Sequence, residues 1–395
     1  MANGRKICVV TDSRAEYGHM RWLCHDIAAA PGLELQNVVT GGHLAPHLHY
    51  TYKVLEADGL TVDWKVESLL AADTPVAIGK SMGLCLQGMA EAFDHLEPEI
   101  VVILGDRYEM LAAASAAMIA CIPIAHIHGG ERTEGAMDEG IRHAITKLSH
   151  LHFCAAAPYR DRLIQLGEDP ERIYNFGAPG LDHLQRTPML PREEMEELLG
   201  MRFGPQVFLV TYHPVTLRGS GQEQRVRGLL AALDAFPEAS VIITGVNVDT
   251  YHAAVSGPIS EWASARPERV KVIASLGQQR YFSMMHIADA VIGNSSSGII
   301  EAPAIPTATV NIGERQAGRL RAMSIIDTGE TEAEILAGIE RALSPEFREI
   351  VRQTESVYGQ GDASRRIVDV LRDVDLDDIL IKKFRDLTLA GTGTM

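Results

Sequence analysis

The stretch Ile100–Met118, IVVILGDRYEMLAAASAAM, contains the pattern that decides the fold. Its first five residues are apolar and mostly β-branched, as in a strand that is buried on both faces. A glycine turn follows, and then an alanine-rich stretch of high helix propensity. A buried strand that leads through a tight turn into a helix is typical of a parallel α/β sheet, because parallel strands need a crossover between them.

Similar apolar runs recur along the chain in two sets, each run followed by polar or glycine residues and a helical pattern. The first set is Lys6–Asp12, Leu35–Gly42, Ile100–Asp106, Ile122–Gly129 and Leu151–Ala155, and the second is Val207–Tyr212, Val241–Gly245, Val270–Ile273, Ala290–Gly293 and Ala308–Ile312. The proline-containing stretch Gly177–Pro205 separates the sets, and a last helical pattern covers Ala363–Val374. We therefore predict two doubly wound, parallel-sheet domains that face one another across a cleft.

Composition and charge exclude several classes of protein. A length of 395 residues fits two domains. The 52 acidic and 36 basic residues give a net charge of -16, which argues against nucleic-acid and membrane partners. The five cysteines are scattered without a CxxC pair, so neither a disulfide framework nor a zinc knuckle is indicated. We see no signal peptide and no bilayer-spanning segment, and we expect a cytoplasmic protein.

Polar residues at the ends of the first set of strands are candidates for a site, because ligands of open parallel sheets bind at the carboxyl ends of the strands. Arg14, His43 and the pair Asp106-Arg107 hold such positions. Asp106 is also well placed to cap the helix that follows, which is the structural alternative. The first strand is not followed by GxGxxG, so a nicotinamide cofactor is not indicated.

The segment from His126 to Glu131, HIHGGE, is a sharper signal. His126 and His128 should share one face of a strand, and with Glu131 they could bind a metal. The helical segment beyond offers no obvious further ligand set, so acid/base work by Glu131 is favoured. Asp138 and Arg142 stand four residues apart on a predicted helix, where a plain ion pair is the alternative to a functional role.

The second set of strands ends in groups that suit a nucleoside diphosphate. Residues Gly293–Gly298, GNSSSG, offer backbone NH groups, hydroxyls and a helix start, which suit a phosphate. A serine N-cap is the alternative, and the GxSxG pattern of a serine nucleophile is not matched. Glu301 could reach a ribose diol, and His213, Asn247 and Arg315 lie at further strand ends.

Six segments, in this order, resemble the UDP-N-acetylglucosamine 2-epimerase family over nearly the whole chain: GDRYE (105–109), HIHGGERTEGAMDEGIRHAITKLSHLHF (126–153), GAPGLD (177–182), HPVT (213–216), GNSSSGIIEAP (293–303) and NIGERQAGR (311–319). The unbroken IRHAITKLSHLHF (141–153) is similar to the hydrolysing branch. The resemblance implies a GT-B fold with two Rossmann-like domains. These would be residues 1–178, with a C-terminal helix in 364–395 packing back on them, and residues 179–363.

The resemblance also implies an activity. It would be conversion of UDP-N-acetylglucosamine to UDP and N-acetylmannosamine for sialic acid synthesis, by elimination of UDP and hydration of the resulting glycal. The alternative substrate is UDP-2,4-diacetamido-2,4,6-trideoxyglucose, for legionaminic acid. Other classes are a GT-B glycosyltransferase, a serine hydrolase and a non-catalytic sugar-nucleotide-binding protein. We expect neither a cofactor nor a metal. We expect the protein to form a homodimer or a homotetramer.

Site roles follow from the resemblance, residue by residue. Asp106, Glu131 and Asp138 would be the catalytic carboxylates, with Glu139 leaving the third position ambiguous, and His213 would join them. The residues expected to bind the UDP-sugar are Arg14, His43, Arg107, Arg142, Asn247, Ser295, Ser296, Glu301 and Arg315.

Overall fold

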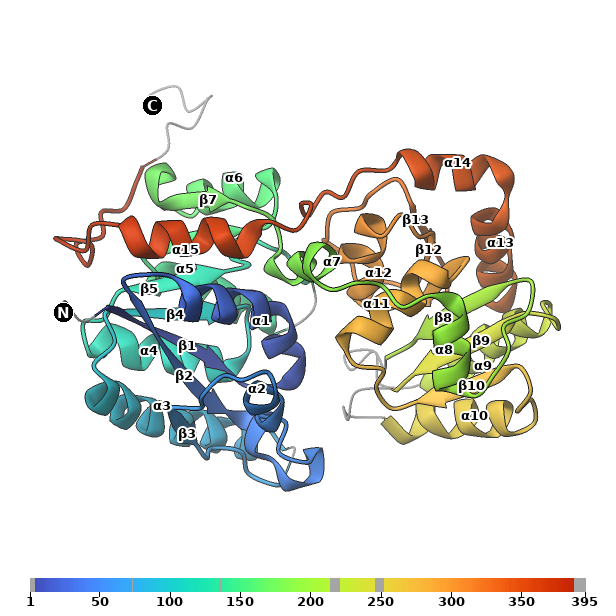
Figure 1. Ribbon diagram of the computed structural model, residues 1–395, viewed down its shortest axis with the longest axis horizontal. Coiled ribbons are helices and arrows are strands. Elements are labelled where there is room, and N and C mark those ends of the chain that lie inside the picture. Colours follow the sequence, from blue (N-terminus) through green and yellow to red (C-terminus); the bar gives the residue numbers. More distant parts are fainter. Residues whose placement is uncertain (1–3, 73, 135–136, 214–220, 246–251, 387–395) are drawn as a thin grey trace, which may run out of the picture. The chain divides into compact units, whose positions relative to one another are not determined.

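The computed structural model describes residues 4–72, 74–134, 137–213, 221–245 and 252–386, and contains two compact α/β units (Figure 1). The first unit comprises Met1–Glu131, Met137–Asp182 and Gly361–Met395, and the second comprises Arg132–Ala136 and His183–Gln360. The short helix α7 (Asp182–Arg186) begins at the end of the first unit.

The first unit is built on a parallel sheet of seven strands in the order β3-β2-β1-β4-β5-β6-β7. The strands are β1 (Arg5–Thr11), β2 (Leu33–Thr40), β3 (Trp64–Val66), β4 (Ile100–Leu104), β5 (Ile124–Ile127), β6 (Leu151–Cys154) and β7 (Ile173–Asn175). The helices are α1 (Arg14–Ala29), α2 (Lys53–Ala57), α3 (Pro75–Leu96), α4 (Tyr108–Ile119), α5 (Asp138–Leu148), α6 (Ala157–Gln165) and α15 (Ala363–Asp373).

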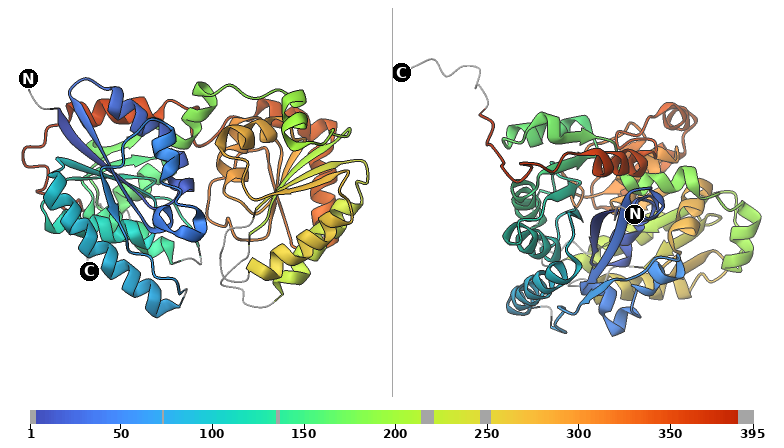
Figure 2. Two further views of the ribbon diagram at one scale, coloured as in Figure 1. Left: turned by 60° about the horizontal axis from the view of Figure 1, so that its bottom comes forward. Right: turned by 60° about the vertical axis from the view of Figure 1, so that its left-hand side comes forward.

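Helices cover both faces of this sheet, which explains why its strands are apolar at nearly every position. Ile7 and Val9 of β1 pack in one core with α1 and α15, whereas Cys8 and Val10 pack in another core with α3 and α4. Successive side chains of a strand point to opposite faces, so every residue of β1 needs an apolar neighbour. The C-terminal helix α15 lies beside α1 although some 340 residues separate them in sequence (Figures 1 and 2).

The second unit repeats the design with a parallel sheet of six strands in the order β10-β9-β8-β11-β12-β13. The strands are β8 (Val207–Thr211), β9 (Ser240–Thr244), β10 (Val270–Ile273), β11 (Ala290–Gly293), β12 (Thr309–Ile312) and β13 (Ile325–Thr328). The helices are α8 (Arg192–Leu199), α9 (Gln222–Asp234), α10 (His252–Ser264), α11 (Gln278–Ile287), α12 (Ser297–Ile300), α13 (Glu332–Leu343) and α14 (Pro345–Gln353). Again the faces alternate: Phe208 and Val210 pack with α9, α10 and α13, and Val207 and Leu209 pack with α8 and α11.

All ten predicted strands are present, with bounds that differ by no more than two residues at either end. Three further strands, β3, β7 and β13, escaped the sequence analysis. Each is an edge strand of three or four residues, too short to show a periodicity. The predicted linker Gly177–Pro205 contains the single-turn helix Pro179–Leu181 as well as α7 and α8.

The cysteines are free, four of them buried and Cys121 exposed. Within the described ranges, the helices are all too short or too polar to cross a lipid bilayer.

Candidate active site

Arg142 is the centre of the polar site in the first unit. Its side chain is only 1% exposed, yet it lies on α5 among three carboxylate-bearing segments. It contacts Oδ2 of Asp106, donates to Oε2 of Glu139 at 2.9 Å and donates to the backbone carbonyl of Glu131 at 3.0 Å. One buried cation therefore holds together the ends of β4 and β5 and the first turn of α5.

Asp106 follows β4, and its role as a helix cap is excluded. Helix α4 begins at Tyr108, its N-cap is Arg107, and no side chain caps it. Asp106 stands one residue too early, and its carboxylate accepts from Arg142 instead. The side chain is 24% exposed, so one edge of this carboxylate remains open to solvent.

Glu131 and His128 form a close pair on the turn after β5. The carboxylate of Glu131 lies 2.5 Å from Nδ1 of His128 and is 3% exposed. The backbone of the turn needs glycine at Gly130, where φ is +80° and a Cβ would lie 2.4 Å from the carbonyl of Tyr159. A carboxylate in hydrogen-bond contact with an imidazole is equipped for acid/base chemistry.

The expectation that His126 and His128 share a strand face was wrong. Strand β5 ends at Ile127, and His128 has a left-handed φ of 65°. His126 points into the core, where Nε2 lies 2.8 Å from the carbonyl of Gly105 and Nδ1 lies 3.3 Å from the hydroxyl of Thr146. Burial lowers the pKa of His126 to about 3, so the ring is neutral and structural. The described ranges contain no group of three or more His, Cys, Asp or Glu placed to hold a metal ion.

The two carboxylates in the first turn of α5, Glu139 and Asp138, have different surroundings. Glu139 contacts Arg142 and also lies 3.1 Å from Nε2 of His143. Asp138 is the first residue of the helix and is half-buried. The predicted pairing of Asp138 with Arg142, four residues apart on this helix, stays a prediction.

A second polar cluster lies at the ends of β1, β2 and β4. It combines three buried carboxylates that the sequence analysis missed, those of Asp12, Glu16 and Glu109, with Arg107, whose side chain is 55% exposed. Arg107 contacts Asp12, which is 1% exposed, and Nε of Arg107 lies 3.3 Å from Glu109. The carboxylate of Glu16 accepts from the backbone NH of Asp12 at 2.6 Å. Asp12 directly follows a strand, which was the available signal, whereas Glu16 and Glu109 look like ordinary first-turn glutamates.

The charges of this cluster oppose one another. Burial raises the pKa of Asp12, but the charge of Arg107 and the hydrogen bonds of Glu16 and Ser13 together outweigh burial, so the net pKa is lowered. Burial, and then the charge of Asp12, raise the pKa of Glu16 well above its ordinary value. Burial likewise lowers the pKa of His43 to about 4, although Asp12 opposes this, so His43 is neutral at pH 7. Nearby, Arg14 begins α1 and is exposed.

In the second unit, Asn294 organises the strand ends. Its side chain accepts from the backbone NH of His213 at 2.7 Å and donates to the His213 carbonyl at 2.8 Å. Its backbone carbonyl accepts from Arg315 at 3.0 Å and from Gln316 at 2.9 Å. His213 and Arg315 are thus brought together, and burial followed by the Arg315 charge lowers the pKa of His213 to about 4.

The serine turn follows immediately. Ser295, Ser296 and Ser297 are half-buried, and Ser295 Oγ accepts from the NH of Ser297 at 3.3 Å. Ser296 is the N-cap of α12, and Glu301, buried to 3% exposure, follows that helix. Asn247 lies outside the described residues.

Residues 25–372 match the family model of UDP-N-acetylglucosamine 2-epimerase. The chain belongs to this family. It is 40% identical to the GDP/UDP-N,N'-diacetylbacillosamine 2-epimerase (hydrolyzing) of Campylobacter jejuni over 97% of this chain and 99% of that protein. It is 33% identical to polysialic acid biosynthesis protein P7 of Escherichia coli over 93% of this chain and 94% of that protein.

The fold of this 2-epimerase family member also has a solved counterpart. The crystal structure of UDP-GlcNAc 2-epimerase from Neisseria meningitidis matches with a TM-score of 0.79 at 19% identity, covering 93% of this chain and 99% of that one. The predicted GT-B-like α/β class and the resemblance to the hydrolysing branch are both confirmed.

Proposed function

We propose that this 2-epimerase hydrolyses UDP-2,4-diacetamido-2,4,6-trideoxyglucose to UDP and the free 2-epimeric sugar. The reaction type is supported by the carboxylates that Arg142 gathers at the ends of β4 and β5. The substrate is supported by the 40% identity to the Campylobacter enzyme, which carries a diacetylated sugar in its name.

The chemistry needs a base and a stabilised leaving group. In an α-linked 2-acetamido sugar of glucose configuration, the leaving oxygen at C1 and the hydrogen at C2 are both axial, on opposite faces of the ring. Removal of that proton breaks the C1–O bond, expels UDP and leaves a C1–C2 double bond. Addition of water, with OH at C1 and a proton at C2 from the other face, gives the free sugar with C2 inverted.

The roles proposed for residues of the first unit are supported by its geometry. Glu131, paired with His128, is proposed to exchange a proton, and Asp106 is the carboxylate with the more exposed edge, available to water or sugar. Asp138 remains a candidate for the third carboxylate. Arg142 contacts protein groups on three sides, so we propose that it orients the carboxylates.

Roles in the second unit concern the UDP leaving group. Ser295 and Ser296 are proposed to bind the β-phosphate, with His213 and Arg315 beside them, and Glu301 to bind the ribose hydroxyls. Hydroxyls, backbone NH groups and a guanidinium at one strand end stabilise a diphosphate as negative charge develops on it. Arg14, Arg107, His43 and Asn247 stay as predicted substrate contacts.

UDP-N-acetylglucosamine is the second candidate substrate, giving N-acetylmannosamine. The 33% identity to a polysialic acid biosynthesis protein favours it. The two sugars differ at C4 and C6. The diacetamido sugar carries an acetamido group at C4 in place of a hydroxyl, and a methyl group at C5 in place of a hydroxymethyl.

The two substrates are separated by parallel assays of the purified protein, with UDP release and free sugar followed by NMR. We expect a higher kcat/KM for the diacetamido sugar, without an acceptor, which a glycosyltransferase would need. A higher kcat/KM for UDP-N-acetylglucosamine would overturn the substrate assignment. Turnover of neither sugar, with UDP still bound, would overturn the enzyme assignment.

A further inference from the structure

The chain after α15 stays on the first unit and is held there by several contacts. Ile379 is 2% exposed in the core that contains α1 and α15, and its carbonyl accepts from Arg172 at 2.8 Å. The backbone NH of Arg385 donates to the carbonyl of Gly167 at 3.1 Å. We call residues 376–386 the C-terminal segment.

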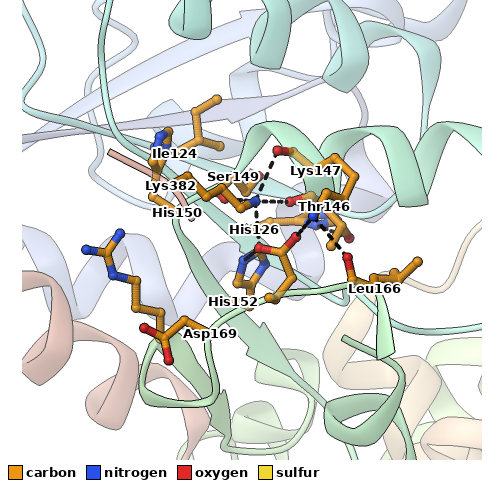
Figure 3. Close-up of polar contacts among 12 residues, drawn as sticks. Ile124, His126, Thr146, Lys147, Ser149, His150, His152, Leu166, Asp169 and Lys382 are labelled. Atoms are coloured by element: carbon orange, nitrogen blue, oxygen red, sulfur yellow. Dashed lines mark hydrogen bonds and ion pairs between the residues drawn. The ribbon is translucent and has the colours of Figure 1, made fainter. Parts of the chain in front are cut away.

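Lys382 is the residue of this segment with the most polar contacts. Its ammonium donates to the carbonyls of Thr146 at 3.0 Å, Lys147 at 3.0 Å and Ser149 at 2.6 Å. It also lies 2.6 Å from Oε2 of Glu168. Figure 3 shows the ammonium among these oxygens, at the point where α5 ends. Four oxygens around one nitrogen form a cage for a cation that donates hydrogen bonds.

The cage supplies hydrogen-bond donors to backbone carbonyls at the carboxyl end of α5. The last four carbonyls of a helix have no partner within the helix, and they carry the negative end of its dipole. At the end of α5 the NH of Ser149 donates to the Thr146 carbonyl at 3.2 Å, and the Ser149 hydroxyl donates to the Ile145 carbonyl at 2.7 Å. Lys382 completes this end from more than 230 residues away in sequence.

Glu168 supplies the counter-charge and ties the cage to the sheet. It is 1% exposed, and its carboxylate also contacts Nζ of Lys147 at 2.6 Å and Nε2 of His152 at 2.9 Å. His152 on β6 stands in register with His126 on β5. The cage is therefore anchored in the buried sheet as well as in α5.

Helix α5 joins the cage to the candidate active site. Thr146, whose carbonyl Lys382 holds, bonds His126 through its hydroxyl, and His126 bonds the carbonyl of Gly105. Gly105 precedes Asp106, and Arg142, one turn before Thr146, contacts Asp106 directly. A shift or fraying of the end of α5 would thus move both groups that set the position of Asp106.

We propose that Lys382 is a positioning residue: its ammonium closes the carboxyl end of α5 and thereby fixes Arg142 and Asp106 in the active site. This inference rests on the proposed function for its kinetic consequence only. The C-terminal segment is accordingly part of the catalytic apparatus, although it touches no reacting atom. The cage should also accept a free ammonium ion once the lysine side chain is removed.

The test compares Lys382→Ala with Lys383→Ala, a matched control that removes the same charge from the exposed neighbouring residue. For Lys382→Ala we expect kcat to fall by about tenfold or more, because small displacements of catalytic groups are costly, while UDP affinity changes by less than about twofold. Lys383→Ala should keep the wild-type kcat. Ammonium chloride should raise the melting temperature and kcat of Lys382→Ala only, and tetramethylammonium chloride at equal ionic strength should not, because it cannot donate hydrogen bonds.

Three results would overturn the inference. These are a wild-type kcat in Lys382→Ala, equal effects of the two salts, and an equal loss in Lys383→Ala. If Lys382→Ala does not fold in either salt, Lys382→Met replaces it, because methionine keeps most of the apolar part of the lysine side chain. A folded Lys382→Met enzyme with wild-type kcat would overturn the inference. A folded enzyme with reduced kcat would support it. The melting-temperature measurement requires no turnover, so it tests the cage even if the wild-type protein acts on neither UDP sugar.

Discussion

At the scale of single residues, the sequence indicates candidate strand ends but not the contacts that side chains make there. Asp106 and Glu131 could be proposed from the sequence because each lies in the turn that follows an apolar strand. Arg142 was expected to bind substrate, yet it is buried and contacts Asp106 and Glu139. Sequence spacing shows which residues share a helix face, but it does not show which loop from another strand lies opposite that face.

Glu131→Gln tests the acid/base assignment at this scale. Glutamine keeps the size of the side chain and can still bond His128, but it cannot exchange a proton. We predict that kcat falls by about 10²- to 10⁴-fold, the usual contribution of general acid/base catalysis. Calorimetric UDP affinity and melting temperature should change little. A lower melting temperature with activity in proportion to the folded fraction would instead assign Glu131 a structural role.

At the scale of elements, strand β11 shows how backbone geometry positions the turn that we propose binds phosphate. Gly293 ends β11 with φ at 137°, and a Cβ there would lie 2.0 Å from the carbonyl of Thr211 on β8. The two strands pair at this point, and Asn294 and the serine turn follow. Glycine lets the strands close and so sets the position of the whole turn.

Gly293→Ala should therefore lower the free energy of unfolding by roughly 2 kcal/mol or more and weaken UDP binding in the folded fraction. The matched control is Gly83→Ala on the exposed side of α3, where a Cβ would meet nothing within 4 Å. This control should be neutral or slightly stabilising, as alanine favours a helix over glycine. Urea unfolding and UDP titration of both variants make the comparison; equal stability of the two would contradict the account of β11.

Elements also show where prediction from sequence stops. Nine of the ten predicted strands lie inside a sheet, where helices cover both faces and the apolar runs are nearly continuous. The tenth, β10, is an edge strand in which Val270 is buried and Val272 is exposed. The edge strands β3 and β7 have three residues each, and packing rather than pattern decides that they pair. The C-terminal helix could be predicted from its pattern, but its place beside α1 depends on contacts between distant parts of the chain.

At the scale of the whole molecule, buried histidines should make stability depend on pH. Burial lowers the pKa of His43, His150 and His213 to about 4 and that of His126 to about 3, from 6.5. Below pH 6.5 the unfolded chain binds protons that the folded chain does not. The stability due to neutral rings is thus complete above pH 6.5 and is lost as the pH falls toward 4.

We predict that the free energy of unfolding, measured with urea, decreases from about pH 6.5 toward about pH 5, by up to roughly 1.4 kcal/mol per pH unit for each histidine. His126→Gln should make this dependence on pH less steep, by the contribution of at most one bound proton. A stability that stays constant across this range would show that the rings are protonated in the folded protein.

The central claim, that the molecule epimerises C2 by elimination and hydration, is tested most directly by running the reaction in D₂O. The substrate is UDP-2,4-diacetamido-2,4,6-trideoxyglucose, with UDP-N-acetylglucosamine in parallel, and the free sugar is examined by NMR and mass spectrometry. The account predicts UDP and a free sugar that has inverted configuration at C2 and one deuterium bound to that carbon. A free sugar that keeps its C2 hydrogen and its original configuration would show simple hydrolysis of the glycosyl phosphate bond and would contradict the account.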